Sequence, residues 1–202
     1  KTIKVIHTIV KKVKCPVVVD PIIKSTTGTI LLKKSAMNDF KKMIIPLATI
    51  ITPNKKEAKI LSGQNSIMNA AKKIQEMGAR NVIITGSVET KNAIDDFVLE
   101  ESRSYNLKGK KIKITNHGSG CNYSASFTAS LAMKKTIHDS ALFAKEYAFQ
   151  SIRNSKSLGK GINITIKEQS DIHKELTRSV VNFQNIKNIS NLIPECQTNF
   201  VF

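Results

Sequence analysis

The sequence predicts an α/β fold with a mainly parallel sheet that helices cover on both faces. Three short runs, residues 16–20, 47–51 and 81–86, are rich in Val, Ile and other apolar residues, which is typical of strands buried on both faces. Between these runs, apolar residues recur at the three- and four-residue spacing of amphipathic helices. Buried strands that alternate with amphipathic helices indicate a parallel sheet with helices on both sides.

The other elements are predicted from the same periodicities. Ser35 is expected to cap one helix, and Gly63 is expected to close the helix that Asn54 begins. The predicted helices are 1–13, 35–43, 54–61, 66–77, 122–133 and 138–155, and the remaining predicted strands are 97–100, 102–107 and 111–115. The pattern changes after residue 165, so we expect one domain over 1–165 and the start of another over 166–202.

Length and composition limit the class of protein. The 202 residues suffice for one domain with an appendage, and no apolar run is long enough for a membrane-spanning helix. Three widely spaced cysteines without a CxxC pair argue against a zinc site or a disulfide framework and fit a cytoplasmic protein. The chain starts with Lys1 and ends at Phe202 without a polar tail, so we expect a fragment of a longer protein.

The formal net charge of +17 is high and could indicate a nucleic-acid partner or a small anionic ligand. The lysines, however, are scattered along the whole chain, and no stripe of basic and aromatic residues occurs. A solvated lysine-rich surface explains this pattern better. We therefore expect neither a nucleic-acid nor a membrane partner.

A glycine turn, Gly118-Ser119-Gly120-Cys121, stands between the predicted strand 111–115 and the predicted helix 122–133. A turn of this kind aims free backbone N–H groups and the positive end of a helix dipole at an anion. Cys121 falls at the helix start, where a thiol pKa is expected to be lowered. The residues alone are also compatible with an ordinary helix N-terminus and a buried cysteine.

Polar residues follow each of the three buried strands: Asp20, then Asn54 with Glu57, then Thr85-Gly86. The carboxyl ends of parallel strands meet at one edge of a sheet, where ligands bind. Carboxylates beside a phosphate-binding turn suit a Mg²⁺-nucleotide and phosphoryl transfer. Taken singly, Asp20 could only end a strand and Asn54 could only cap a helix. No P-loop motif and no G-x-G-x-x-G after a strand is present.

These blocks resemble the hydroxymethylpyrimidine/phosphomethylpyrimidine kinases of thiamine biosynthesis, which have the ribokinase-like fold. The resemblance covers residues 1–165. It rests on four blocks and on a late glycine loop: Val17-Val18-Val19-Asp20-Pro21, Thr52-Pro53-Asn54-x-x-Glu57-Ala58, residues 82–86, His117-Gly118-Ser119-Gly120-Cys121, and Gly159-x-Gly161. The cysteine after the glycine turn is specific, because most ribokinase relatives carry Asp there.

The resemblance implies an ATP- and Mg²⁺-dependent kinase that phosphorylates hydroxymethylpyrimidine and then its monophosphate. It implies that Cys121 is the catalytic base, with Gly118, Ser119 and Gly120 as the anion hole. Asp20 and Glu57 would lie on the Mg²⁺ side. The residues that it places near the nucleotide are Asn54, Thr85, Gly86, Gly159 and Gly161.

The tail gives a second resemblance. Residues 175–199 are similar to the opening of the thiamine-phosphate synthase domain that follows this kinase in archaeal fusion proteins. The chain is therefore expected to come from a bifunctional enzyme, and none of the second active site falls within it. A homodimer is compatible with this interpretation.

The chain also departs from the family pattern. Thr85-Gly86-Ser87 stands where the family has Lys-Gly-Gly, so a cation near the phosphates is missing, which Lys24 or Lys145 could replace. Asn122 replaces a Thr, and the amino-terminal strand and the glycine-rich pyrimidine-binding segment do not occur in this chain. Two alternatives stay open, a pyridoxal-type vitamin kinase and a non-catalytic ligand-sensing relative.

Overall fold

The computed structural model describes residues 2–25, 28–101, 103–114, 116–155 and 163–164. The tail 166–202 and the loop with Gly159 and Gly161 lie outside these residues. None of the helices in the described ranges combines the length and the apolar character that crossing a membrane requires.

The main sheet has five strands in the order β1 to β5. The first three strands, β1 (Val18–Val19), β2 (Ile50–Ile51) and β3 (Asn81–Glu89), are parallel. Two further strands, β4 (Ile94–Glu100) and β5 (Arg103–Leu107), continue the sheet antiparallel. The predicted α/β class is confirmed, and the described sheet is mixed because short turns join its last three strands.

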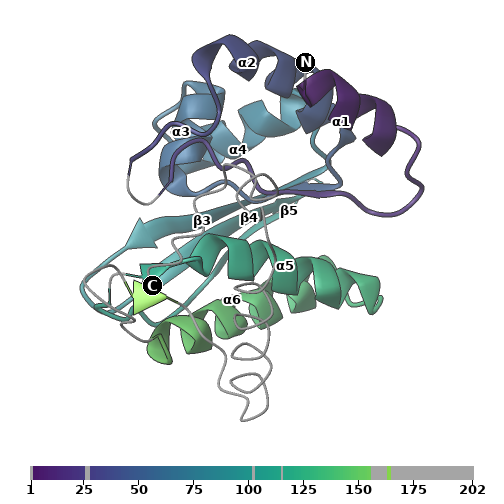
Figure 1. The fold of residues 1–202 in the computed structure, drawn as a ribbon. Helices are drawn as coiled ribbons and strands as arrows, with labels where there is room; N and C mark the ends of the chain where they lie inside the picture. Colours follow the sequence, from purple (N-terminus) through teal and green to yellow (C-terminus); the bar gives the residue numbers. More distant parts are fainter. Residues whose placement is uncertain (1, 26–27, 102, 115, 156–162, 165–202) are drawn as a thin grey trace, which may run out of the picture.

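Helices cover both faces of this sheet (Figure 1). The amino-terminal helices, including α3 (Lys55–Ser62) and α4 (Ile67–Glu76), lie on one face. The last two helices, α5 (Ser119–Ala132) and α6 (Ile137–Arg153), pack against each other on the opposite face. This arrangement confirms the two covered faces predicted from the sequence.

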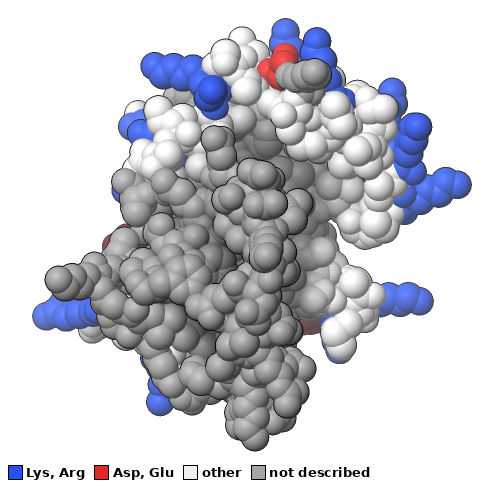
Figure 2. Space-filling model, viewed as in Figure 1, with Lys and Arg blue, Asp and Glu red and all other residues white. Residues whose placement is uncertain are grey.

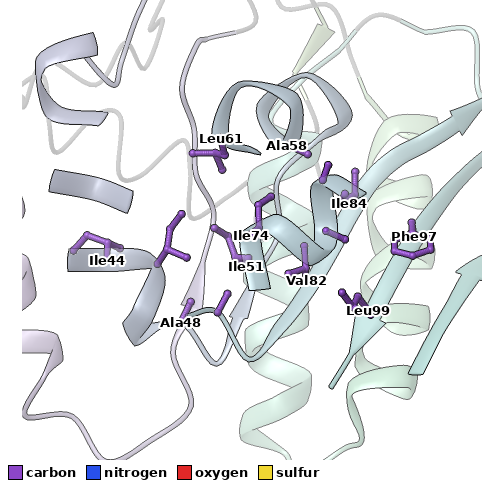
Figure 3. Close-up of a cluster of buried hydrophobic side chains, with 14 of the residues drawn as sticks. Ile44, Ala48, Ile51, Ala58, Leu61, Ile74, Val82, Ile84, Phe97 and Leu99 are labelled. Carbon is purple, nitrogen blue, oxygen red and sulfur yellow. The ribbon is translucent and has the colours of Figure 1, made fainter. Parts of the chain in front are cut away.

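Successive strand residues point to opposite faces, and the two buried clusters follow this alternation. Ile51, Val82 and Ile84 join Leu61 and other residues of α3 and α4 in one cluster (Figure 3). The other cluster lies under α5 and α6 and contains Ile50, Ile83, Val98, Leu107, Tyr123, Phe127, Ala141 and Ala144. Both faces of β2 and β3 are therefore buried, as their apolar runs predicted.

The segment before β2 differs from the prediction. Ser35 is not a cap, because α2 (Lys34–Asp39) has Lys33 at its N-cap without a side-chain hydrogen bond. The chain continues as a π-helical turn, Phe40–Ile44, and then as a 3₁₀ turn, Ile45–Leu47. These turns bury Phe40, Ile44 and Ile45. The predicted strand 47–51 is thus reduced to β2, because its first residue still belongs to a helical turn.

The other amino-terminal predictions agree better with the structure. The first helix, α1 (Thr2–Val10), is present within the range predicted for it. Asn54 is the N-cap of α3, and Gly63 closes that helix with a left-handed φ of 73°.

The prediction of a strand over 111–115 is wrong for residues 111–114, which the structure describes. Residues 109–111 instead bond to the β3–β4 hairpin, through Ile94 N–H to the Gly109 carbonyl at 2.9 Å and Lys111 N–H to the Asn92 carbonyl at 3.0 Å. The strand before the glycine turn is β6 (Asn116–His117), which pairs in parallel with β7 (Asn163–Ile164).

Lysine and arginine side chains are spread around the described part of the face in Figure 2. They do not gather there into one stripe, which matches their scattered positions in the sequence.

Candidate active site

One cleft lies where the carboxyl ends of the parallel strands meet the start of α5. It brings together every predicted site residue that the structure describes: Asp20, Asn54, Glu57, Thr85, Gly86, Gly118, Ser119, Gly120 and Cys121. The parallel pairing of β1, β2 and β3 places the first five at one edge. The convergence predicted from the strand ends is therefore present.

The glycine turn forms the first turn of α5. Gly118 is the N-cap with a left-handed φ of 95°, and no side chain caps the helix. A side chain at this φ would be strained. The N–H groups of the first helical turn have no partners within the helix, so those of Ser119, Gly120 and Cys121 are available to an anion.

Gly120 has an ordinary helical position but no side chain. A Cβ built on Gly120 would meet no atom within 4 Å, so no protein neighbour requires glycine there. Glycine within a helix destabilises it by roughly 0.5–1 kcal/mol relative to alanine. The open space over the turn fits the close approach of a phosphate.

Asp20 follows β1 and is tied to α5. The Ser124 hydroxyl donates a hydrogen bond of 3.1 Å to Asp20 Oδ2. Burial raises the pKa of the Asp20 carboxyl, and the Ser124 hydrogen bond lowers it in part. The carboxylate therefore lies beside the glycine turn at a position where a bound cation would stabilise its charge.

Glu57 and Asn54 form a capping box at the start of α3. The Asn54 side chain accepts hydrogen bonds from the N–H groups of Lys56 and Glu57, and Glu57 Oε2 accepts the Asn54 N–H at 2.9 Å. Glu57 Oε1 also accepts the Ile23 N–H at 3.3 Å. Burial raises the pKa of Glu57, and the charge of Asp20 adds to this effect. The capping box gives Asn54 and Glu57 a local structural role. The Glu57 carboxylate also lies close enough to Asp20 for the two charges to interact.

Thr85 and Gly86 stand beside this cap. Thr85 forms a parallel bridge with Asn54, and its N–H bonds to the Pro53 carbonyl at 2.9 Å. Gly86 has a left-handed φ of 60°, within a register irregularity of the β3–β4 pair between Ile84 and Val88.

Cys121 is exposed at the cleft. The expected lowering of its pKa is wrong for the protein without ligands, because desolvation, together with the charges of Asp20 and Glu57, raises the pKa of the thiol. The thiol and both carboxylates therefore influence one another electrostatically.

The sequence interpretation missed Asp96, which lies at the inner side of the cleft. Its Oδ1 accepts the Gly86 N–H at 2.9 Å, and its Oδ2 pairs with Lys145 Nζ at 2.8 Å. The available signal was an acidic pair, Asp95-Asp96, in the apolar run that becomes β4. Of the two lysines named as replacements for the missing cation, Lys145 is held in this way, whereas Lys24 lines the cleft as an exposed side chain.

The fold of this chain is similar to those of solved kinases of small molecules. An ADP complex of Bacillus subtilis pyridoxal kinase is 30% identical with a TM-score of 0.70, over 81% of this chain and 64% of that one. The phosphomethylpyrimidine kinase of Clostridium difficile is 28% identical with a TM-score of 0.62, over 74% of this chain and 63% of that one. The fold is therefore that of the ribokinase-like vitamin kinases, as the sequence predicted.

Sequence comparison narrows this class to one family. The chain belongs to the phosphomethylpyrimidine kinase family, whose model matches residues 1–166. A hydroxymethylpyrimidine/phosphomethylpyrimidine kinase of Aquifex aeolicus is 34% identical over 154 residues, which are 73% of this chain and 60% of the relative. The thiamine biosynthesis bifunctional protein ThiED of Geobacter sulfurreducens is 30% identical over 151 residues, 72% of this chain and 31% of that protein. The family expected from the sequence is confirmed, and the chain spans 60% of the length of the Aquifex relative.

Proposed function

We propose that the protein transfers a phosphoryl group from ATP to the hydroxymethyl group of hydroxymethylpyrimidine, and then to the resulting monophosphate, in thiamine biosynthesis. The observation that carries this proposal is the glycine turn at the start of α5, which shares one cleft with Asp20 and Glu57. Family membership supports the substrate, and solved relatives in complex with ADP or AMP-PCP support ATP as the donor.

The donor set of the cleft fits Mg²⁺. Asp20 and Glu57 offer carboxylate oxygens, and no group of three or more potential metal ligands occurs among the described residues. Mg²⁺ needs no such cage, since it is bound by one or two carboxylates, waters and substrate phosphates. Both oxygens of Glu57 already accept backbone N–H groups, so Asp20 is the better direct ligand. The ion would neutralise part of the phosphate charge.

Cys121 is proposed as the catalytic base. Its sulfur would accept the proton of the hydroxymethyl O–H, the oxygen would bond to the γ-phosphorus, and the bond to the β–γ bridging oxygen would break to release ADP. The raised pKa of the free thiol means that the base form needs compensating positive charge beside Asp20 and Glu57. The N–H groups of Ser119, Gly120 and Cys121 would stabilise the charge that develops on the transferred group.

The nucleotide is proposed to lie against the strand ends on the other side of the cleft. Asn54, Thr85 and Gly86 line the cleft there. Their backbone N–H groups already have partners within the protein, so the Asn54 amide group and the Thr85 hydroxyl are the groups proposed to bind phosphate oxygens. Gly159 and Gly161 are proposed as nucleotide contacts on the family resemblance alone.

We also propose that residues 1–165 belong to the kinase domain and that 166–202 begin a thiamine-phosphate synthase-like domain of a bifunctional cytoplasmic protein. The family match over 1–166 supports the first boundary. The bifunctional Geobacter relative supports such a fusion. A homodimer is proposed, and light scattering of the full-length protein tests it.

A pyridoxal-type kinase is the second candidate, because the pyridoxal kinase of Staphylococcus aureus in complex with pyridoxal has a TM-score of 0.72 at 28% identity. Measurement of kcat/KM for hydroxymethylpyrimidine and for pyridoxal, with the same full-length protein, ATP and Mg²⁺, separates the two. A higher value for the pyrimidine supports the proposal. A higher value for pyridoxal reassigns the substrate, and ligand binding without any ATP turnover indicates a sensing protein.

A further inference from the structure

The inner side of the cleft contains a buried ion pair that has no part in the roles above. Lys145 Nζ lies 2.8 Å from Asp96 Oδ2, with the two side chains 13% and 5% exposed. In the other lysine–carboxylate pairs of the described residues, the lysine side chain is at least 29% exposed. Withdrawing two charges from water is costly, and a buried pair is weak evidence for stability. Its presence in a ligand cleft therefore suggests a functional charge.

Lys145 is fixed in one position by its surroundings. Its aliphatic stem crosses Gly109 so closely that a Cβ there would collide with Lys145 Cε. Gly109 is itself anchored, because its N–H bonds to Asp95 Oδ1 at 3.2 Å and its carbonyl accepts the Ile94 N–H. The ammonium group is thus positioned before any ligand arrives, which reduces the entropy lost on binding.

Asp96 connects this ammonium group to the end of β3. One oxygen of Asp96 accepts the Gly86 N–H at 2.9 Å while the other binds Lys145. The positive charge therefore lies one carboxylate away from the Thr85-Gly86 turn, where β3 itself offers no cation. Asp96 occupies one of the three N–H donors of the ammonium group in this pair, and within the described part of the chain no further carboxylate pairs with it, so other donors can bind a ligand.

Tyr123 supplies an independent sign of a ligand in the same cleft. It is 5% exposed and lines the cleft, one helical turn after Ser119. Within the described part of the chain, its hydroxyl has no hydrogen-bond partner. A buried hydroxyl without a partner is unfavourable by about 1–3 kcal/mol. Burial raises the pKa of the Tyr123 phenol, and the charge of Asp96 adds to this effect, so the hydroxyl stays protonated and can donate.

We propose that Lys145 and the Tyr123 hydroxyl together bind a phosphate oxygen of the nucleotide, with Asp96 as the residue that positions Lys145. This inference rests on the proposed function in one respect, because it takes the ligand to be a nucleotide. In this protein, the cation on the nucleotide side of the cleft comes from α6 and not from the end of β3. The Lys145 ammonium group and the Tyr123 hydroxyl are both hydrogen-bond donors, and the charge of the first favours an anionic oxygen as the acceptor.

The test measures binding of Mg-ADP, adenosine and hydroxymethylpyrimidine phosphate to the full-length protein by calorimetry. The variant Lys145→Met is expected to lose about tenfold or more in affinity for Mg-ADP, the effect of one charge-assisted hydrogen bond. Its affinities for adenosine and for the pyrimidine phosphate should stay within about twofold of those of the unaltered protein. Lys72→Met, at an exposed position of α4 on the opposite face, is the matched control.

Loss of Lys145 leaves Asp96 buried and unpaired, so the single variant could fail for structural reasons. The double variant Asp96→Asn/Lys145→Met removes both charges and separates structure from binding. Persistent loss of Mg-ADP affinity in a normally folded double variant supports the proposal. Restored affinity, an equal loss for adenosine, or a loss confined to the pyrimidine phosphate overturns it.

Tyr123→Phe gives a second readout that does not disturb the ion pair. We expect weaker Mg-ADP binding, by a few-fold, together with unchanged or higher thermal stability, because an unpaired buried hydroxyl is removed. Unchanged Mg-ADP affinity would remove Tyr123 from the site. Nucleotide binding that follows these predictions without any phosphorylation of the pyrimidine would refute the proposed substrate and leave this inference intact.

Discussion

The Ser124 hydroxyl donates a 3.1 Å hydrogen bond to Asp20, across 104 positions of the sequence. This contact joins the first helical turns of α5 to the carboxyl end of β1. It holds a carboxylate beside the glycine turn, so the groups proposed to bind an anion and the carboxylate proposed to bind a cation lie in one cleft. The proposed phosphoryl-transfer site depends on this proximity.

Replacement of Cys121 by alanine should reduce kcat by about 10²- to 10⁴-fold, as the loss of a general base does. Substrate KM should change much less, because the thiol acts on the proton in the transition state. Steady-state kinetics of the full-length protein measure both. Cys15→Ala is the matched control, since Cys15 is also an exposed free cysteine but does not line the cleft. Turnover that survives Cys121→Ala would assign the base to another group.

Gly120→Ala should separate stability from activity. Alanine should keep or raise the melting temperature, since no protein atom lies near the new Cβ and alanine favours a helix. The methyl group would meet the phosphate, and kcat/KM should fall by about tenfold or more. Gly118→Ala is the contrast, because its φ of 95° should make alanine destabilising by about 1–2 kcal/mol. Full activity of Gly120→Ala would argue against phosphate contact at the turn.

Asp20→Asn should stabilise the ligand-free protein at neutral pH. Burial raises the pKa of Asp20 in the folded state, so stability is highest below the ordinary aspartate pKa of about 3.9 and is lost as the pH rises through the raised value. The amide avoids this loss, and we expect a melting temperature about 2–4 °C higher at pH 7. At a pH below that window the two proteins should differ little.

The same variant tests the metal site. Added Mg²⁺ should raise the melting temperature of the unaltered protein and not that of Asp20→Asn, because a ligand that binds only the folded state stabilises it. Equal stabilisation of both proteins by Mg²⁺ would exclude Asp20 as a ligand.

Asn54 has a structural role that must be separated from nucleotide binding. Asn54→Ala should destabilise the protein by about 1 kcal/mol, because it removes the side-chain cap of α3. Asn54→Ser retains a capping oxygen and should restore stability, as thermal unfolding will measure. If Asn54→Ser also restores the KM for ATP, the cap explains the residue. A KM that stays raised assigns a nucleotide contact to the amide.

Much of the fold could be predicted from short-range patterns. The apolar runs identified β2 and β3 because both faces of these strands are buried, and the same pattern identified β1, whose two residues are half-buried. Asn54 and Gly63 marked the ends of α3 because capping and a left-handed φ are local properties. The strand predicted at 111–115 was wrong for the described residues. Alternation of apolar and polar residues does not distinguish a strand from an irregular segment whose backbone hydrogen-bonds to a neighbouring hairpin.

The site was predictable to the extent that it lies at strand ends and helix starts. Asp20, Glu57 and the glycine turn follow from the topology of a parallel sheet. The raised pKa of Cys121 could not be predicted in this way, since it depends on burial in the folded chain and on carboxylates 101 and 64 positions away in the sequence. Asp96 escaped notice for the same reason, because its partners on β3 and α6 come together only in the folded chain.

The most direct test of the central proposal is transfer of label from γ-labelled ATP to hydroxymethylpyrimidine by the full-length protein with Mg²⁺. The proposal predicts a labelled monophosphate, then a diphosphate, with formation of both reduced at least about 100-fold in Cys121→Ala. Absence of any labelled pyrimidine product, from a protein shown to bind Mg-ADP, would contradict it.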